Sequence, residues 1–237
     1  MRIAILTQEK YYSYAAMLGD LICEEWIVYF DHEKYTSIDN MQLCTKKVDL
    51  SRFDFAISLL YNRIIRNNEF DLPKYGTINV HPSLLPLHRG STPNFWAVLT
   101  GVGAGWTAHR MTSELDRGDI YLQREAPVLL SDTAETLWER LFEELPSFLS
   151  ELASVITQGE LKPIDVTQDV EQVNKLSDFH AMHDYDNMLQ TMNEHERVAS
   201  YATLNLIQAC SFTGYNGFIM NTPDGRVEFS ARRLDAS

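Results

Sequence analysis

The segment TINVHPSLLP, residues 77–86, decides the fold class that we expect for this chain. Its first half, Thr77–His81, has the pattern of a buried strand, which Pro82 ends because proline cannot donate to a ladder. Asn79 and His81 are two residues apart, so their side chains leave the strand on the same side. Open α/β sheets bind ligands at the carboxyl ends of their strands. We therefore predict that this strand carries Asn79 and His81 into a ligand site.

Apolar runs and helical patterns alternate on both sides of this strand. Asp132-Thr133-Ala134-Glu135 has the spacing of a capping box with Asp132 as the cap, and a long amphipathic helix to Ile156 follows, with a kink expected at Pro146. The order predicts an α/β domain with a mostly parallel open sheet and helices on both faces. Strands are expected at 3–6, 26–30, 53–60, 106–111 and 120–128, and helices at 14–25 and 93–99.

The composition changes after residue 160. Residues 163–200 are polar, and the tail 212–234 holds two turn signals between short β-prone runs, which predicts a terminal β-hairpin. We therefore expect a catalytic domain over 1–160 and a small α+β extension over 161–237. The extension is expected to serve dimerisation and substrate contacts.

The charge of the chain limits its partners. The 20 Lys and Arg against 33 Asp and Glu give a net charge of −13, which repels polyanions and argues against RNA or DNA as a partner. A small phosphorylated substrate stays possible, because arginines act locally within a Debye length of about 8 Å.

The cysteines and the apolar runs bear on the compartment. Cys23, Cys44 and Cys210 show no paired or zinc-binding spacing, which is typical of reduced thiols. The first residues are apolar only briefly, and no 18-residue apolar run occurs. We expect a cytoplasmic protein without membrane contact.

Three residue types near this strand fit acyl transfer to an amine. The amide of Asn79 can hold an oxyanion, His81 can accept a proton near neutral pH, and a carboxylate can stabilise the charged imidazole. The carboxylate comes from the segment LDRGD, residues 115–119, where Asp116 and Asp119 are both candidates. Without a catalytic role, His81 would be a buried structural histidine and the aspartate a solvated loop residue. The residues alone do not choose between the two aspartates.

The two segments together resemble the folate-dependent formyltransferase superfamily. The shared pattern is Asn-x-His-x-Ser-x-Leu-Pro at 79–86, followed by Leu-Asp-x-Gly at 115–118, within a region of resemblance over residues 50–130. That superfamily includes glycinamide ribonucleotide transformylases, methionyl-tRNA formyltransferases and sugar N-formyltransferases. The resemblance implies a Rossmann-like fold and a catalytic centre of Asn79, His81 and Asp116, with Asp119 outside it.

The resemblance also implies 10-formyltetrahydrofolate as the formyl donor. The pterin would lie between two loops and be held largely by backbone groups. For Arg63, a solvated loop cation is the alternative. The implied cofactor residues are Arg63, Ile64 and Ile65 in the first loop and Met111, Thr112 and Ser113 in the second.

The segments 88–96 and 105–109 look like the sugar N-formyltransferase branch. That branch implies a homodimer acting on a dTDP-linked 4-amino-4,6-dideoxy or 3-amino-3,6-dideoxy sugar, for O-antigen or other lipopolysaccharide synthesis. A methionyl-tRNA enzyme would need a basic C-terminal domain, and a glycinamide ribonucleotide enzyme would need glycines near residues 6–12, which this chain lacks. A formyltetrahydrofolate hydrolase and a non-catalytic binding module for folate or nucleotide sugar remain alternatives.

A nucleotide ligand requires aromatic faces for the base and cations for the pyrophosphate. Each candidate by itself is more often structural or solvated. The metal alternative, His180 and His183 with Asp184 and Asp186, is a pattern that is common by chance, and formyl transfer needs no metal, so we expect none. The candidate substrate contacts are Lys10, Tyr11, Tyr12, Lys74, Arg89, Tyr185 and Tyr215.

Overall fold

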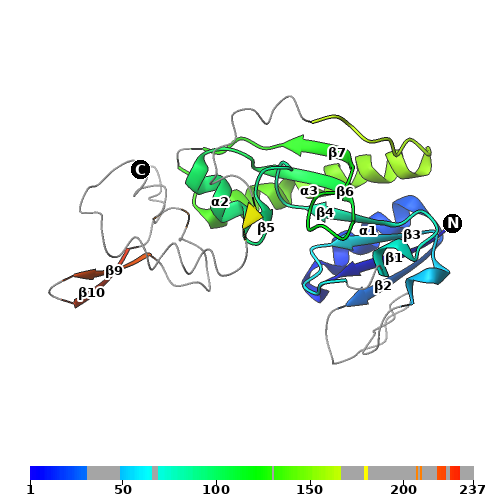
Figure 1. Ribbon diagram of the computed structural model, residues 1–237, viewed down its shortest axis with the longest axis horizontal. Coiled ribbons are helices and arrows are strands. Elements are labelled where there is room, and N and C mark those ends of the chain that lie inside the picture. The colour runs from blue at the N-terminus through cyan, green and yellow to red at the C-terminus, as the bar shows by residue number, and fades with distance from the viewer. Residues whose placement is uncertain are drawn as a thin grey trace. The chain divides into compact units, whose positions relative to one another are not determined.

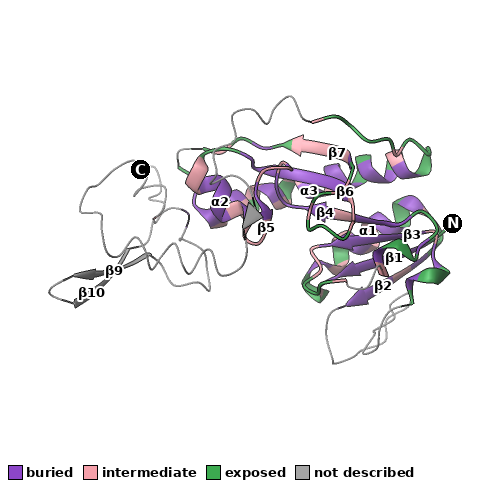
Figure 2. Ribbon diagram, in the orientation of Figure 1, coloured by how far each residue is buried: buried purple, intermediate pink, exposed green. Residues whose placement is uncertain are grey.

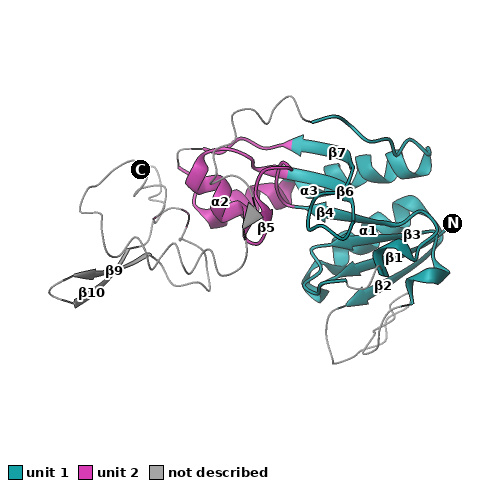
Figure 3. Cartoon of the chain, viewed as in Figure 1, with its two compact units in different colours: residues 1–81, 106–124, 144–169 teal, residues 82–105, 125–143, 170–237 magenta. Residues whose placement is uncertain are grey.

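The computed structural model describes residues 1–30, 49–65, 69–129 and 131–166, with the short segments 179–180, 207, 209, 218–222 and 225–229. The chain divides into two compact units, shown in teal and magenta in Figure 3. Unit 1 comprises residues 1–81, 106–124 and 144–169, and unit 2 comprises residues 82–105, 125–143 and 170–237. No helix in the described part of the chain is long and apolar enough to cross a membrane.

A six-stranded sheet with the order β2-β1-β3-β4-β6-β7 forms the centre of unit 1 (Figure 1). β1 pairs in parallel with β2 and β3, β3 pairs in parallel with β4, and β4 pairs antiparallel with β6. The predicted α/β class with a mostly parallel sheet is therefore confirmed. The strands are β1 Arg2–Thr7, β2 Glu25–Phe30, β3 Phe55–Leu59, β4 Thr77–His81, β6 Gly105–Arg110 and β7 Ile120–Glu125.

Three α-helices lie close to the positions that the sequence predicts. The last continues through Pro146 as one helix of 24 residues. Within residues 1–166, the described α-helices are α1 Tyr12–Ile22, α2 Pro93–Thr100 and α3 Ala134–Thr157, and the described 3-10 helices are η1 Glu9–Tyr11, η2 Leu50–Arg52 and η3 Glu69–Asp71.

One face of the sheet packs against α1 and the second half of α3. Gly19 of α1 lies directly over Trp26 of β2, where a Cβ would come 2.5 Å from the indole ring. On α3, the ring of Phe148 lies 6.4 Å from that of Trp106 on β6. Strands β1 and β3, in the middle of the sheet, are buried along almost their whole length, as Figure 2 shows in purple. Burial of these apolar side chains is the main stabilising contribution in unit 1.

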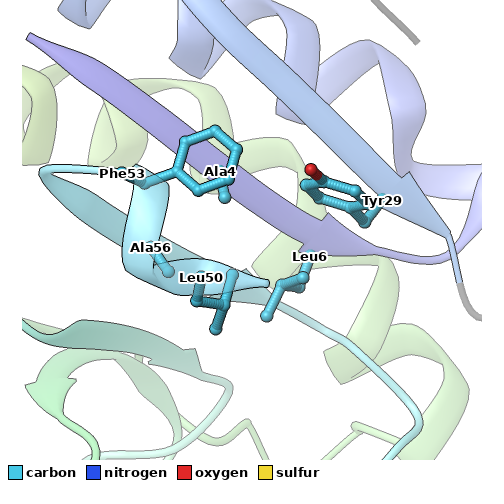
Figure 4. Close-up of a cluster of buried hydrophobic side chains, with 6 residues drawn as sticks. All are labelled: Ala4, Leu6, Tyr29, Leu50, Phe53 and Ala56. Carbon is cyan, nitrogen blue, oxygen red and sulfur yellow. The ribbon is translucent and has the colours of Figure 1, made fainter. Parts of the chain in front are cut away.

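The opposite face carries a second apolar cluster and, further along the sheet, the polar residues of interest. The cluster joins Ala4 and Leu6 of β1 to Tyr29, Leu50, Phe53 and Ala56 (Figure 4). Ala56 pairs with Thr77, and Ser58 with Asn79. Because register partners point to the same side and side chains alternate along a strand, Asn79 and His81 share this face.

Unit 2 contains α2 and the start of α3, and its helix ends follow local rules. Pro93 occupies the first turn of α2, and Gly101 ends that helix in the left-handed region at φ 77°, with its N–H bonded to the carbonyl of Ala97. The predicted cap of α3 at Asp132 is wrong. Thr133 and Thr136 cap the helix reciprocally, because each hydroxyl accepts the backbone N–H of the other.

The carboxylate of Asp132 has other partners in unit 2. It accepts the N–H of Leu129 at 2.7 Å and the guanidinium of Arg140. Asp132 therefore ties the loop before α3 to the second turn of that helix.

The predicted terminal hairpin is confirmed by β9 Phe218–Thr222 and β10 Gly225–Phe229, which pair antiparallel. A two-residue strand, β5 Arg89–Gly90, pairs in parallel with β8 Phe179–His180. The latter contact joins the loop that follows β4 to a segment about ninety residues later in the chain.

Candidate active site

Strand β4 places Asn79 and His81 beside the antiparallel strand β6. Asn79 is the register partner of His109, and His81 is the register partner of Thr107. His81 and His109 are 5 % and 1 % exposed, and their rings meet edge to face with centroids 6.4 Å apart. The pairing therefore sets two imidazoles and one carboxamide on the same side of the sheet.

The loop after β6 returns Asp116 to this face. Asp116 adopts a left-handed conformation at φ 52°, which aspartate tolerates better than most residues. Two residues later, Gly118 lies against the main chain of Arg110, so close that a Cβ would come 1.8 Å from the Arg110 carbonyl oxygen. Glycine is therefore required at this position for the loop to close over β6.

The carboxylate of Asp116 lies between the two histidines. Its Oδ2 is 3.8 Å from Nδ1 of His81, and its Oδ1 is 3.5 Å from Nε2 of His109. The amide nitrogen of Asn79 is 3.1 Å from Nε2 of His109 and 3.5 Å from Oδ1 of Asp116. The side chain of Asp116 is only 7 % exposed, so little water screens these interactions.

This geometry favours Asp116 over Asp119 as the carboxylate of the site. Asp119 is exposed, and its backbone carbonyl accepts the N–H of Arg110 as part of the main-chain pairing of β6. The structure thus brings together the three residues that the sequence singles out, Asn79, His81 and Asp116.

His109 is a fourth member of the group that the sequence analysis did not identify. It stands in the β-prone run Trp106–Arg110, where an alternating pattern puts Thr107 and His109 on the same side. Its register with Asn79 depends on pairing between segments 30 residues apart in the chain. The signal in the sequence that could have identified His109 was the alternation of polar Thr107 and His109 with apolar residues along this strand.

The group can perform proton transfer and stabilise charge. A histidine next to a buried carboxylate is stabilised in its protonated form, so His81 can take a proton from a reacting group while Asp116 balances the charge. A carboxamide held in a buried site can donate an N–H to a developing oxyanion. These are the functions that acyl transfer to an amine needs.

An open pocket of about 400 Å³ lies beside the amino end of β4, within the usual size range for small-ligand sites. Its lining includes Met111, Thr112 and Ser113, three of the predicted cofactor residues. Arg110 also lines it and pairs with Asp71 at 3.1 Å, and that hydrogen bond raises the pKa of the guanidinium above its ordinary value. The remaining lining residues are Phe70 and Asp71.

The other predicted cofactor residues, in the loop after β3, do not line this pocket. Ile65 packs against the cluster on the site-bearing face, Arg63 is exposed, and Ile64 is 73 % exposed. Gln8 fixes the start of this loop, because its amide donates to the carbonyl of Leu60 at 2.6 Å and to Oδ1 of Asn62 at 2.8 Å. The loop therefore begins at the carboxyl end of β3, where α/β sheets bind ligands.

The predicted substrate residues lie in several places. Lys10, Tyr11 and Tyr12 follow β1 at the carboxyl edge of the sheet; Lys10 is exposed and lies 4.7 Å over the ring of Tyr11. Arg89 belongs to β5 of unit 2 and is 6 % exposed. Tyr185 and Tyr215 lie outside the described residues.

Lys74 is not brought to the edge that holds the other candidates. Its N–H bonds to the carbonyl of Phe53, just before β3, which places it at the amino end of the parallel strands. Its ammonium group lies over the ring of Tyr75, and the hydrogen bond that it donates to the Tyr75 side chain raises the pKa of Lys74. Asn79 and His81 lie at the opposite end of β4.

The described ranges contain no group of three or more His, Cys, Asp or Glu that could hold a metal ion. Of the predicted metal alternative, only the backbone of His180 is described, and His183, Asp184 and Asp186 lie outside the described residues. Cys23 is a free thiol whose pKa is raised by burial, and Cys44 and Cys210 also lie outside.

The chain matches a known protein family. The formyl transferase family model matches residues 24–152, which is more than half of the chain. The chain is 39 % identical over 129 residues to a methionyl-tRNA formyltransferase from Ehrlichia chaffeensis, and the match covers 54 % of this chain and 42 % of that protein. The matched region thus spans less than half the length of this curated relative.

Solved structures share the fold over more of the chain. A sugar N-formyltransferase from a Shewanella species has a TM-score of 0.78 at 18 % identity and covers 100 % of this chain and 99 % of its own. The formyltransferase PseJ from Anoxybacillus kamchatkensis was solved with UDP-4,6-dideoxy-4-formamido-L-AltNAc and tetrahydrofolate. It has a TM-score of 0.61 at 27 % identity, and the match covers 82 % of this chain and 93 % of PseJ.

An N-formyltransferase from Helicobacter canadensis was solved with folinic acid and dTDP-3-aminofucose. It has a TM-score of 0.65 at 16 % identity, and the match covers 97 % of this chain and 96 % of the Helicobacter chain. At such identities the likeness to the Shewanella and Helicobacter proteins concerns the fold alone.

Proposed function

The chain belongs to the formyl transferase family, and from this premise we propose that it transfers a formyl group from 10-formyltetrahydrofolate to the amine of a nucleotide-linked amino sugar. The observation that carries the proposal is the group of Asn79, His81 and Asp116 on one face of the sheet, in which the side chains of His81 and Asp116 are each 7 % exposed. Each supplies a function that attack of an amine on a formyl carbon requires.

In the proposed mechanism, the amine of the acceptor attacks the formyl carbon and loses a proton to His81. Asp116, 3.8 Å from Nδ1 of His81, stabilises the imidazolium that forms. The proton then passes to the folate nitrogen as the carbon–nitrogen bond of the donor breaks, so that the products are the formamide and tetrahydrofolate.

Asn79 is assigned to the oxyanion that develops on the formyl oxygen. Its amide makes a 3.1 Å contact with His109 and a longer 3.5 Å contact with Asp116. The longer contact is the weaker one, so we assign that N–H to the oxyanion in the transition state. Removal of one such donor costs about 10²–10³ in rate, or roughly 3–4 kcal/mol.

The pocket beside Met111, Thr112 and Ser113 supports a site for the pterin or its extension. Ser113, which lines the pocket, precedes Asp116 by three residues. The same loop therefore lines the pocket and carries the catalytic carboxylate. The PseJ and Helicobacter structures contain tetrahydrofolate and folinic acid, which supports a folate donor here as well. Arg63, Ile64 and Ile65 belong to the loop at the carboxyl end of β3, away from this pocket, and we propose them as a separate contact of the folate.

The sugar acceptor is supported by two further observations. Several of the solved relatives that cover most of this chain are described as sugar formyltransferases or contain nucleotide sugars, although a methionyl-tRNA formyltransferase from Clostridium thermocellum also covers 99 % of it. The net charge of −13 disfavours a tRNA, which is a polyanion. We propose a dTDP-linked 4-amino-4,6-dideoxy or 3-amino-3,6-dideoxy sugar first, with Lys10, Tyr11, Tyr12, Arg89, Tyr185 and Tyr215 as candidate contacts, and an O-antigen or related glycan as its destination.

Methionyl-tRNA is the second candidate acceptor, because the curated relative named above is a methionyl-tRNA formyltransferase. That similarity covers the region of the catalytic residues and less than half of the relative's length. It therefore supports the shared formyl chemistry more strongly than the shared acceptor.

The decisive experiment incubates the protein with 10-formyltetrahydrofolate and, in separate reactions, a panel of dTDP- and UDP-linked 3-amino and 4-amino dideoxy sugars and methionyl-tRNA. Mass spectrometry would detect the gain of one CO on the acceptor, and absorbance would follow the release of tetrahydrofolate. We expect formylation of one nucleotide sugar and none of the tRNA.

Two outcomes would contradict the proposal. Formylation of methionyl-tRNA alone would transfer the assignment to the second candidate. Release of formate without any acceptor, at the same rate with and without amino sugars, would indicate a hydrolase. Asn79→Ala serves as the matched slow control, because it removes the amide and leaves the strand pairing of β4 intact.

A further inference from the structure

We infer that His109 is a positioning residue of this site: as a neutral imidazole, it accepts an N–H of Asn79 and thereby fixes the orientation of that amide beside Asp116. The inference rests on the proposed formyl transfer for its role in rate. The arrangement itself is a property of three side chains, those of Asn79 on β4, His109 on β6 and Asp116 in the following loop.

The proton of His109 is located by its contact with the main chain. Nδ1 lies 3.0 Å from the carbonyl oxygen of Arg110. A carbonyl oxygen only accepts hydrogen bonds, so Nδ1 carries the hydrogen. Nε2 also lies 3.5 Å from Oδ1 of Asp116, a contact that favours the protonated ring, whereas the N–H of Asn79 favours the neutral ring, in which Nε2 has a lone pair and accepts.

Asn79 is the donor that this lone pair meets. Nδ2 of Asn79 is 3.1 Å from Nε2 of His109 and 3.5 Å from Oδ1 of Asp116. If the amide were turned over, its oxygen would face both the imidazole lone pair and a carboxylate oxygen, and all of these are acceptors. His109 and Asp116 therefore select one orientation of Asn79 together.

The selected orientation leaves the amide oxygen of Asn79 for another donor. Both of these contacts of the Asn79 amide use its nitrogen and not its oxygen, Oδ1. An incoming amine carries N–H groups that this oxygen can accept, which would align its lone pair with the formyl carbon. A protonated His109 would instead donate from Nε2 and favour the reverse orientation of the amide.

The backbone that holds the proton of His109 is itself held in place. Gly118 approaches the carbonyl of Arg110 so closely that a Cβ would overlap it, at 1.8 Å. The same carbonyl accepts Nδ1–H of His109. The glycine of the Leu-Asp-x-Gly segment thus supports the tautomer of His109 as well as the return of Asp116.

A double-mutant cycle tests the role through Asn79. His109→Leu should lower kcat roughly 10²-fold with a much smaller change in KM, because it removes the acceptor that orients the amide. His109→Gln should restore most of this loss, since its amide oxygen can accept the same N–H. Combining His109→Leu with Asn79→Ala should cost little beyond Asn79→Ala alone, as expected for residues that act as a unit.

Gln123→Met is the matched control for disturbance of the sheet. Gln123 lies on β7 and donates to Thr107 of β6 at 3.0 Å. The fold-loss in kcat from Gln123→Met should multiply with the fold-loss from Asn79→Ala in the double variant. If the effect of His109→Leu also multiplies, or if His109→Gln is as slow as His109→Leu, the positioning role is wrong.

A second measurement does not depend on activity. Nitrogen-15 NMR of the histidine rings should show His109 as the neutral Nδ1–H tautomer at pH 7.5, and its Nε2 signal should shift in Asn79→Ala. A cationic ring or the Nε2–H tautomer would overturn the inference. Wild-type protein that formylates no acceptor would instead contradict the proposed function, while the NMR result would still decide the tautomer.

Discussion

A Cβ at Gly118 would lie 1.8 Å from the carbonyl oxygen of Arg110, although eight residues separate the two in the chain. This close approach lets the loop after β6 turn back so that Asp116 reaches the imidazoles of His81 and His109. The conformation of one loop thus controls the position of the carboxylate in the candidate active site.

The first prediction concerns this contact. Gly118→Ala should lower kcat by about 10²-fold or more, because the loop must move away from Arg110 and carry Asp116 with it. We also expect a loss of about 1–3 kcal/mol in unfolding free energy from overpacking, measured by urea denaturation. The control is Arg117→Ala in the same loop, whose side chain is 55 % exposed and pairs with exposed Glu114. Equal activities of the two variants would contradict the assigned role of Gly118.

The choice between the two aspartates gives a second prediction. Asp116→Asn should lower kcat by about 10²- to 10⁴-fold, because His81 loses the charge that stabilises its protonated form. Asp119→Asn should stay within about twofold of the wild type, since its side chain is exposed and only its backbone takes part in the pairing. Steady-state kinetics with the active acceptor would decide, and similar losses in both variants would refute Asp116 as the special carboxylate.

Helix α1 supplies a third prediction, on stability. Alanine is favoured over glycine inside a helix by about 1 kcal/mol, but at Gly19 its Cβ would come 2.5 Å from the ring of Trp26. We expect overpacking to win, so that Gly19→Ala lowers the unfolding free energy by roughly 1–3 kcal/mol. In a Trp26→Leu background, where the indole ring is gone, Gly19→Ala should lower the unfolding free energy by less than it does in the wild-type protein. A more stable Gly19→Ala variant would show that the contact is easily relieved.

The cap of α3 yields a fourth prediction. Thr133→Ala removes the hydroxyl that accepts the N–H of Thr136 at 3.1 Å, and it should lower the unfolding free energy by about 1 kcal/mol. Thr133→Ser keeps the hydroxyl and should retain most of the stability in thermal unfolding. If Thr133→Ser were as unstable as Thr133→Ala, the methyl group rather than the hydrogen bond would be the important feature.

A fifth prediction concerns pH. The hydroxyl and N–H of Ser51 donate to Oδ1 of Asp49 at 2.6 Å and 3.1 Å and lower the pKa of that carboxyl below its ordinary value of 3.8. Since the pKa is lowered on folding, the stabilising effect is present above pH 3.8 and is lost as the pH falls through the lower, folded-state pKa. Ser51→Ala should raise the pKa of Asp49, measured by carboxyl NMR titration, and Ser51→Thr should leave it near its wild-type position. An unchanged pKa in Ser51→Ala would contradict the assigned cause.

Local pattern was sufficient for the parts of the fold that depend on near neighbours. The side chains of Asn79 and His81 share a face because alternation along a strand is a local property. The ends of α2 follow from Pro93 and Gly101 in the same way. The cap of α3 was misplaced by one residue, because Asp132 and Thr133 are both good caps and only the pairing of Asp132 with Arg140 decides between them.

The sequence by itself determined the α/β class, the terminal hairpin and the residue types that carry the chemistry, since each follows from periodicity or from a short motif. Only the tertiary structure brought His109 beside Asn79 and placed Asp116, rather than Asp119, against the imidazoles. Those positions depend on the register between β4 and β6 and on the close approach of Gly118 to Arg110. Both involve segments that are distant in the chain, and their energies come from pairing and packing that no local pattern contains.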